Sequence, residues 1–332
     1  MYKKSILAGI LSLSSLLISA QAVADATLLN VSYDVTREFY KDFNASFIQY
    51  WKQKTGETVT INQSHGGSSK QARAVADGLE ADIISMNQAP DIDILHDRSK
   101  LIPKDWHKRL PNASSPTSST TVFLVRKGNP KQIKDWDDLV KPGISVVIPN
   151  PKTSGNGKYS YLAAWGYVIK NGGDDAQAKN FVTKLFKNVP VLDAGGRGAT
   201  TTFAQREIGD ALLTFENEVN LIKKELGDKF DVVYPSSSIL AENPIAVVDK
   251  FSIKHKNQAL AQAYAEYHFS EAGQEIAAHH YLRPSLPSVA NKYKTRFKDI
   301  ALFSVNDTFG GWSKAQKTHF ADGAIFDQIY QR

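Results

Sequence analysis

Four short segments of the 332-residue chain contain small, polar or glycine residues in an arrangement that suits anion binding. They span residues 33–36, 65–69, 153–157 and 194–200, and each precedes a stretch with a helical pattern. The first turn of a helix presents unpaired backbone N–H groups and about half a positive charge, so it attracts anions. Glycine lets the backbone approach an anion closely, and serine adds a hydroxyl donor. Because the same residue types also cap helices for structural reasons, only the recurrence of the pattern is informative.

Motifs for catalysis are weak by comparison. Residues 152–158 resemble a phosphate-binding P-loop, but Lys152 replaces the first glycine and Tyr159 replaces the Ser or Thr that binds magnesium. The sequence has no Gly-x-Ser-x-Gly nucleophile elbow. We therefore expect a protein that is not an enzyme and that needs no cofactor.

Metal-binding patterns are weak as well. The chain has no cysteine and no His-Glu-x-x-His motif. His279 and His280 are neighbours on an expected helix, where successive side chains point about 100° apart and chelate poorly. Asp91 and Asp93 lack the glycine and distal glutamate of a calcium loop, so we expect them to be solvated. No metal site is predicted.

Strand and helix patterns alternate in the first part of the chain. The β-type runs 28–32, 58–61 and 81–85 are separated by the helical runs 37–54 and 69–79. This order predicts a mostly parallel sheet with helices on both faces. The glycine- and serine-rich segments would then follow the carboxyl ends of strands, where such folds bind ligands.

A second α/β series begins at 145–148 and continues through 231–234. Two further β-type runs, 120–125 and 245–248, would carry the chain between the two series. We predict an α/β fold of two lobes, with two doubly wound mixed sheets joined by two crossing segments. The predicted parts are 1–24 as signal peptide, 25–120 and 247–332 as lobe I, and 121–246 as lobe II.

The N-terminus has the pattern of a cleavable export signal. Lys3 and Lys4 precede a mostly apolar stretch at 6–18, and Ala22-Val23-Ala24 fits the small-x-small cleavage site. The apolar stretch is short for a hydrocarbon layer of about 30 Å. We expect export to the periplasm, without stable insertion into a membrane.

The charge of the chain is modest. The formal net charge is +6, from 40 Lys and Arg against 34 Asp and Glu, and the lysines are scattered among acidic residues. Nucleic-acid binding needs a concentrated basic face, so we expect no such partner. Without cysteine, stability must come from apolar cores, and we expect a monomer.

The four segments and their surroundings resemble the periplasmic sulfate- and thiosulfate-binding proteins of bacterial ABC importers. The matching strings are LLNVSYDVTRE (28–38), QSHGGSSKQA (63–72), FLVRKGNPKQIKDWDDLV (123–140), PNPKTSGNGKYSYLAAWGY (149–167), GGRGATTTFA (195–204) and FGGW (309–312). The resemblance covers essentially the whole chain after residue 24. It implies the type II periplasmic-binding-protein fold, capture of thiosulfate or sulfate in the cleft between lobes, and delivery to an inner-membrane ABC permease.

The resemblance also implies which residues hold the anion. The first lobe would contribute the backbone near Asp34 and the N–H of Ser68. The second lobe would contribute the hydroxyl and backbone of Ser154 and three further backbone N–H groups. These three belong to Gly155, Asn156 and Gly196. Arg197 is adjacent, and we do not expect it to touch the ligand.

One position departs from the sulfate-binding pattern. Sulfate-type members carry a tryptophan whose indole N–H donates to the ligand, whereas this chain has Phe215. Asn156 also replaces a second glycine after Gly155. Both changes resemble the thiosulfate-binding branch, which is therefore favoured. The open alternatives are a receptor for phosphate or molybdate, and an exported sulfate- or phosphate-ester hydrolase.

Overall fold

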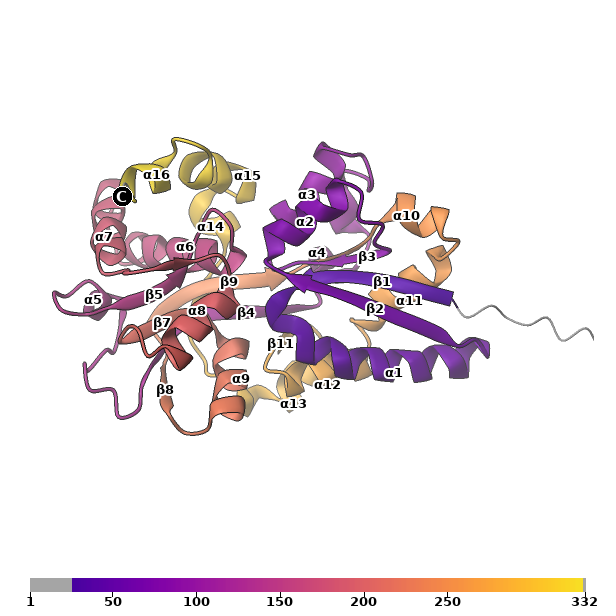
Figure 1. The fold of residues 1–332 in the computed structure, drawn as a ribbon, viewed down its shortest axis with the longest axis horizontal. Helices are drawn as coiled ribbons and strands as arrows, with labels where there is room; N and C mark the ends of the chain where they lie inside the picture. The colour runs from indigo at the N-terminus through magenta and orange to yellow at the C-terminus, as the bar shows by residue number, and fades with distance from the viewer. Residues whose placement is uncertain (1–25, 331–332) are drawn as a thin grey trace, which may run out of the picture.

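The computed structural model describes residues 26–330, so the expected signal peptide at 1–24 lies outside the described residues. The described part forms two lobes side by side, each built around its own sheet with helices on both faces (Figure 1). The predicted two-lobed α/β class is confirmed. Across residues 26–330, every helix is too short or too polar to cross a membrane.

The first lobe contains a four-stranded sheet in the order β10-β3-β1-β2. Strand β1 pairs in parallel with both β2 and β3, whereas β10 runs antiparallel to β3. The parallel pairs follow from the predicted β-α-β-α-β order. The bounds are β1 Ala26–Tyr33, β2 Val59–Gly66, β3 Ile83–Ser85 and β10 Ile245–Val247.

Helix α1, Arg37–Thr55, covers one face of this sheet through a stripe of large side chains. Four residues spaced four apart, which place one face of a helix toward a core, are buried. They are Phe39, Phe43, Phe47 and Trp51. The helix ends where Gly56 adopts a left-handed φ of 80° and donates its backbone N–H to the carbonyl of Lys52.

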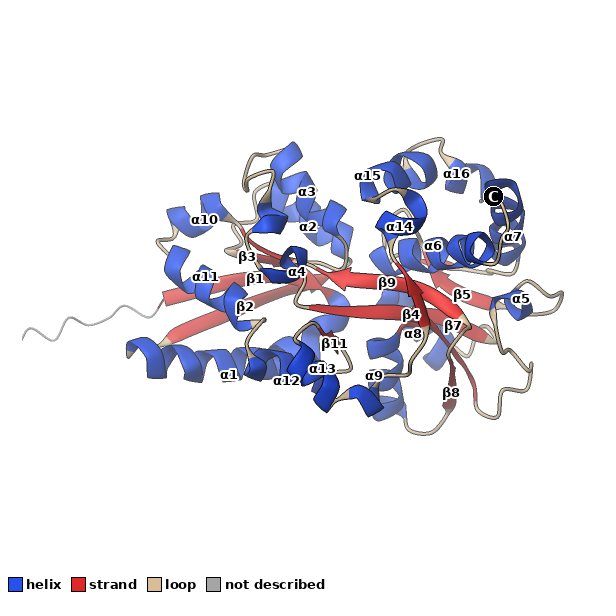
Figure 2. Cartoon of the chain, turned by 180° about the vertical axis from the view of Figure 1, so that it is seen from behind, coloured by secondary structure: helices blue, strands red, loops and turns tan. Residues whose placement is uncertain are grey.

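The other helices of the first lobe lie on both sides of its sheet (Figures 1 and 2). They are α2 Ser68–Ala76, α3 Ala89–Asp97, α4 Pro111–Ser114, α10 Asp249–Lys254, α11 Gln258–Tyr267, α12 Glu271–His279 and α13 Pro287–Lys292.

The second lobe is built on an eight-stranded mixed sheet, with the strand order β12-β9-β4-β7-β5-β6 and both β8 and β11 paired to β4. The strands of this sheet are β4 Thr117–Arg126, β5 Val146–Pro149, β6 Leu192–Asp193, β7 Ala211–Phe215, β8 Phe230–Val233, β9 Ser237–Asn243, β11 Arg283–Pro284 and β12 Ala301–Phe303. Strand β11 pairs with the start of β4 and contacts α12 and α13, so it lies on the side of the first lobe. Its helices are α5 Trp136–Leu139, α6 Gly155–Lys170, α7 Asp175–Lys187, α8 Gly196–Thr200, α9 Glu216–Leu226, α14 Val305–Phe309, α15 Trp312–Ala315 and α16 Ile325–Ile329.

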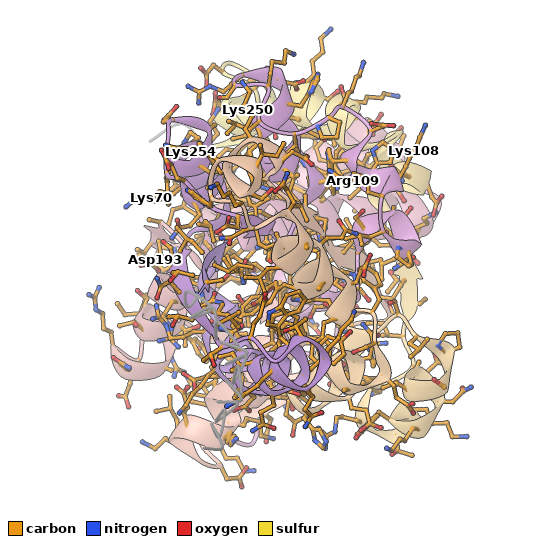
Figure 3. All side chains as sticks on the ribbon, turned by 90° about the vertical axis from the view of Figure 1, so that its right-hand side faces the viewer. Lys70, Lys108, Arg109, Asp193, Lys250 and Lys254 are labelled. Carbon is orange, nitrogen blue, oxygen red and sulfur yellow. The ribbon has the colours of Figure 1, made fainter. Side chains whose placement is uncertain are left out.

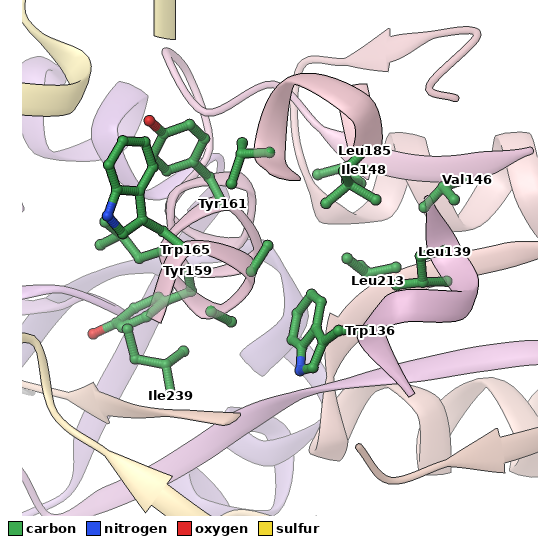
Figure 4. Packing of buried hydrophobic residues seen from close by; sticks show 14 of the residues in the cluster. Trp136, Leu139, Val146, Ile148, Tyr159, Tyr161, Trp165, Leu185, Leu213 and Ile239 are labelled. Carbon is green, nitrogen blue, oxygen red and sulfur yellow. The ribbon is translucent and has the colours of Figure 1, made fainter. Parts of the chain in front are cut away.

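Helix α6 is buried almost throughout its length and forms the centre of the second core. Its aromatic side chains pack between the sheet and the helices that cover it (Figure 4). The largest fully buried side chains there include Trp136, Tyr159, Tyr161 and Trp165. A helix that is buried on most of its surface is typical of such a central position.

Three segments cross between the lobes. Strands β4 and β9 pass from one lobe to the other (Figure 2). The predicted crossing 120–125 lies in β4, whereas the predicted crossing 245–248 falls on β10, which belongs to the first sheet, and the crossing strand is β9 just before it. A third crossing, residues 285–300, leads from β11 to β12 and was not predicted.

Beyond this third crossing the chain belongs to the second lobe. The sequence prediction assigned all of 247–332 to lobe I, but β12 pairs with β9 in the second sheet. Four phenylalanines of this terminal part fill the second core, and they are Phe303, Phe309, Phe320 and Phe326. The amphipathic pattern of the segment predicts helices but does not specify which core they cover.

Candidate ligand-binding site

The four glycine- and serine-rich segments meet where the lobes face each other. A β-carbon at Gly67 of the first lobe would lie 3.7 Å from the carbonyl oxygen of Thr153 and 4.0 Å from that of Ala194. A β-carbon at Gly195 would lie 3.5 Å from the Asp34 carboxylate. Strands β1, β2, β5 and β6 each end within or shortly before one of these segments. The sheet edges of both lobes therefore bring all four together, as expected at the carboxyl ends of strands.

Helix α2 begins at Ser68 with its first backbone N–H groups unused. The first bonds of the helix run from the N–H groups of Lys70 and Gln71 to the carbonyl of Gly67. The backbone N–H groups of Ser68 and Ser69 thus have no carbonyl partner within residues 26–330. They are available to an anion at the lobe boundary.

The hydroxyls of Ser68 and Ser69 are already bonded to Asp91. Ser69 Oγ donates to Asp91 Oδ1 at 2.8 Å, and Ser68 Oγ donates to Asp91 Oδ2 at 2.5 Å. Gln88 Nε2 adds a further bond of 2.8 Å to Oδ2. Asp91 is only 4% exposed, so its predicted solvation is wrong. The buried carboxylate instead fixes the first turn of α2 and occupies both hydroxyls, so that this turn offers a ligand its backbone N–H groups.

Helix α6 presents a similar first turn from the second lobe. Ser154 is its N-cap, and its Oγ accepts a long bond of 3.4 Å from the N–H of Gly157. The backbone N–H of Ser154 donates to the Asn150 carbonyl at 2.9 Å, so the hydroxyl is the donor that remains. The N–H groups of Gly155 and Asn156 lie in the unpaired first turn.

Asn87 of the first lobe is pressed against Gly155 of the second. A β-carbon at Gly155 would lie 2.1 Å from Asn87 Oδ1 and 2.8 Å from Asn87 Cγ, far inside van der Waals contact. Asn87 Oδ1 is buried and accepts no hydrogen bond from the described side chains or backbone. Sequence reasoning missed Asn87, although its position just after the buried strand β3 is a usable signal.

A chain of hydrogen bonds supports the starts of α6 and α8. Asn156 Nδ2 donates to Thr214 Oγ1 at 2.8 Å, and Thr214 Oγ1 donates to Glu218 Oε2 at 2.7 Å. Thr200 Oγ1 donates to Glu218 Oε1, also at 2.7 Å. A β-carbon at Gly196 would lie 3.2 Å from Glu218 Oε2. Burial raises the pKa of Glu218 to about 7. This carboxyl group, which sequence reasoning also missed, lies directly behind the candidate donors.

Charged groups surround the segments at closer range than the sequence suggested. Burial raises the pKa of Asp34, while the backbone N–H of Arg197 and the guanidinium of Arg197 lower it. Burial, together with the positive charges of Arg37 and Arg197, lowers the pKa of His65 to about 4. His65 is therefore neutral near pH 7 and offers no positive charge to an anion.

Phe215 is the predicted site residue with the least direct link to the others. Its ring is 2% exposed, lies 5.8 Å from the Tyr159 ring in an edge-on arrangement, and belongs to the second core. Its neighbour Thr214 bonds to Asn156. The other predicted residues lie in the four converging segments, and three of them are almost fully covered. These are Ser68, Ser154 and Asn156, at 2%, 4% and 3% exposure.

The surface lysines of the first lobe do not form a binding stripe. Lys70, Lys108, Lys250 and Lys254 are exposed and project at separate places around the lobe (Figure 3). Lys254 also pairs with Glu80.

The chain is similar to known solute-binding proteins. Residues 31–283 match the family described as bacterial extracellular solute-binding protein. A thiosulfate-binding protein of Pseudomonas aeruginosa is 59% identical over 98% of this chain and 99% of its own length. A sulfate-binding protein of Salmonella typhimurium is 55% identical over 93% of this chain and 94% of its own.

Solved structures include a similar protein as well. The sulfate-binding protein SubI of Mycobacterium tuberculosis superposes with a TM-score of 0.80 at 32% identity, covering 89% of this chain and 99% of its own. A ferric binding protein of Campylobacter jejuni, at 19% identity and a TM-score of 0.60 over 92% of this chain and 100% of its own, shares the fold alone.

Proposed function

The chain belongs to the bacterial extracellular solute-binding protein family, and from this premise we propose that it captures thiosulfate or sulfate between its two lobes. In this proposal it works in the periplasm as a monomer without catalytic activity, and it delivers the anion to an inner-membrane ABC permease. The observation that carries the proposal is the meeting of helix starts from both lobes. Their backbone N–H groups at Ser68, Gly155, Asn156 and Gly196 would share the charge of a dianion.

The neighbouring carboxyl groups argue against phosphate. Phosphate carries a proton at neutral pH, so a selective site needs a free acceptor for it. The two oxygens of Glu218 accept bonds from Thr200 and Thr214, and the Asp34 carboxylate accepts from backbone N–H groups. Both groups are engaged by the protein itself. A fully ionised anion such as sulfate or thiosulfate needs only donors, which this site has in excess.

Thiosulfate is the favoured ligand, with sulfate also bound. Sulfate-type members of the family that this chain resembles carry a tryptophan at this position, and its indole N–H can donate to the ligand. Phe215 has no such donor. The relative from Pseudomonas aeruginosa is a thiosulfate-binding protein. An aromatic ring without a donor suits the terminal sulfur, which accepts hydrogen bonds weakly.

Calorimetric titration of ligand-stripped protein tests the proposal. We expect saturable binding of thiosulfate and sulfate at one site per chain, and much weaker binding of phosphate and molybdate. Tight binding of phosphate or molybdate with no response to either sulfur anion would overturn the assignment. Hydrolysis of a sulfate or phosphate ester by the purified protein would support the enzyme alternative instead.

A further inference from the structure

A buried ion pair joins the two lobes on the side of the crossing strands. Arg283 Nε and Nη2 donate to the two carboxylate oxygens of Glu216 at 2.6 and 3.1 Å. The Glu216 side chain is 1% exposed and that of Arg283 is 18% exposed. Arg283 Nη2 also donates to the carbonyl of Lys298 at 2.8 Å. A bidentate pair of this kind fixes orientation as well as distance.

The two partners are rigidly attached to different cores. Arg283 directly follows Leu282, which is 3% exposed and packs in the same core cluster as helix α1. Glu216 directly follows Phe215, which packs in the core around helix α6. The pair therefore connects the first core to the second over the length of two side chains. A change in the angle between the lobes must displace one partner from the other.

The segment Thr214–Glu218 links this pair to the candidate binding site. Thr214 and Glu218 bond to each other and hold Asn156. Glu216 holds Arg283, and Asn217 Oδ1 accepts a buried bond of 2.9 Å from Ser119 Oγ on the crossing strand β4. Side chains of this one segment thus contact both the first turn of α6 and the crossing segments.

We propose that Arg283 and Glu216 form a hinge clamp, a pair of positioning residues that holds the lobes in the closed arrangement in which the anion is bound. The inference rests on the proposed function and adds to it how closure is maintained. Breaking the clamp would leave every donor in place but would loosen the approach of Ser68 to Gly155. The affinity for the anion would fall because the closed form is less populated.

The test compares a neutralised pair with wild type. The double variant Glu216→Gln/Arg283→Gln avoids an unpaired buried charge, which would destabilise the fold by itself. We expect its Kd for thiosulfate and sulfate to rise about tenfold. Small-angle scattering at saturating ligand should show a less complete decrease in radius of gyration than in wild type. The variant Arg283→Lys keeps the charge but loses the bidentate geometry, so its Kd should rise by less than that of the double variant. If the double variant does not fold, Arg283→Lys provides the test.

A matched control lies within the first lobe. Arg109 Nη1 donates to both carboxylate oxygens of Asp249 at 2.7 Å, but these two residues belong to one lobe. Arg109→Gln/Asp249→Asn should leave Kd and closure unchanged. A folded clamp variant with wild-type Kd and closure would overturn the inference while leaving the proposed function intact. Failure of wild type to bind either sulfur anion would refute the proposed function itself.

Discussion

Replacing Gly155 with alanine tests the closed arrangement at its tightest point. The new methyl carbon would lie 2.1 Å from Asn87 Oδ1, whereas ordinary contact begins at 3.4 Å. Asn87 or the whole first lobe must therefore retreat. Overpacking of this kind costs about 1–3 kcal/mol. If this free-energy cost acts only on the closed, anion-bound form, the Kd rises about 5- to 150-fold.

The assay is calorimetric titration with thiosulfate, together with thermal unfolding of the ligand-free protein. Gly67→Ala is the matched control, because its methyl would meet only carbonyl oxygens at 3.7 and 4.0 Å and the local φ is −58°. We expect it to bind nearly as wild type does. The variant Asn87→Ala removes the side chain that the new methyl group would meet. In a protein that carries Asn87→Ala, the further change Gly155→Ala should therefore raise the Kd only slightly. An equal loss with and without Asn87 would refute the steric reasoning.

The remaining predictions concern single groups. Ser154→Ala should weaken anion binding about tenfold to a hundredfold, because a hydrogen bond to a charged group is worth about 1.5–3 kcal/mol; unchanged titrations would remove this hydroxyl from the site. Phe215→Trp should shift the ratio of dissociation constants toward sulfate, provided that the indole fits beside Tyr159; a ratio that moves toward thiosulfate would contradict the selectivity assignment. His255 bonds to Asp82 and Glu80, and these carboxylates raise its pKa against the opposing effect of desolvation. Its stabilising contribution should therefore be complete below about pH 6.5 and disappear as the pH rises through the raised pKa. His255→Gln should then lower the melting temperature at pH 5.5 more than at pH 8.5, and equal losses at both pH values would speak against this ion pair.

Local patterns predicted the fold well where one element determines its own burial. The helical run 37–54 predicted α1 almost to its ends, and the composition of the four segments predicted the helix starts that follow them. Asp91 shows the limit of such reasoning. Its environment is created by Ser68 and Ser69, which come from another helix, so spacing alone made it look solvated.

The sequence predicted the backbone segments that meet between the lobes, but it did not predict the side chains that contact them. Glycine and serine report directly on where a chain turns into a helix. The positions of Asn87 and Glu218 cannot be predicted from their neighbours in the sequence, because their contacts are with residues of another lobe or another element. The same reason explains why residues 301–329 were assigned to the wrong side of the boundary, since an amphipathic helix fits any apolar surface of suitable shape.

The docking of the C-terminal residues on the second lobe has a consequence for the order of folding. The first sheet is complete only when β10 arrives at Ile245–Val247, and the second core is complete only when Phe326 arrives. A chain that emerges N-terminus first, from a ribosome or across a membrane, therefore finishes neither lobe until most of it has passed. Incomplete chains expose unpaired strand edges and apolar surface, which chaperones recognise. The order of the elements along the chain therefore delays folding into compact lobes. A protein that crosses a membrane in the unfolded state benefits from such a delay.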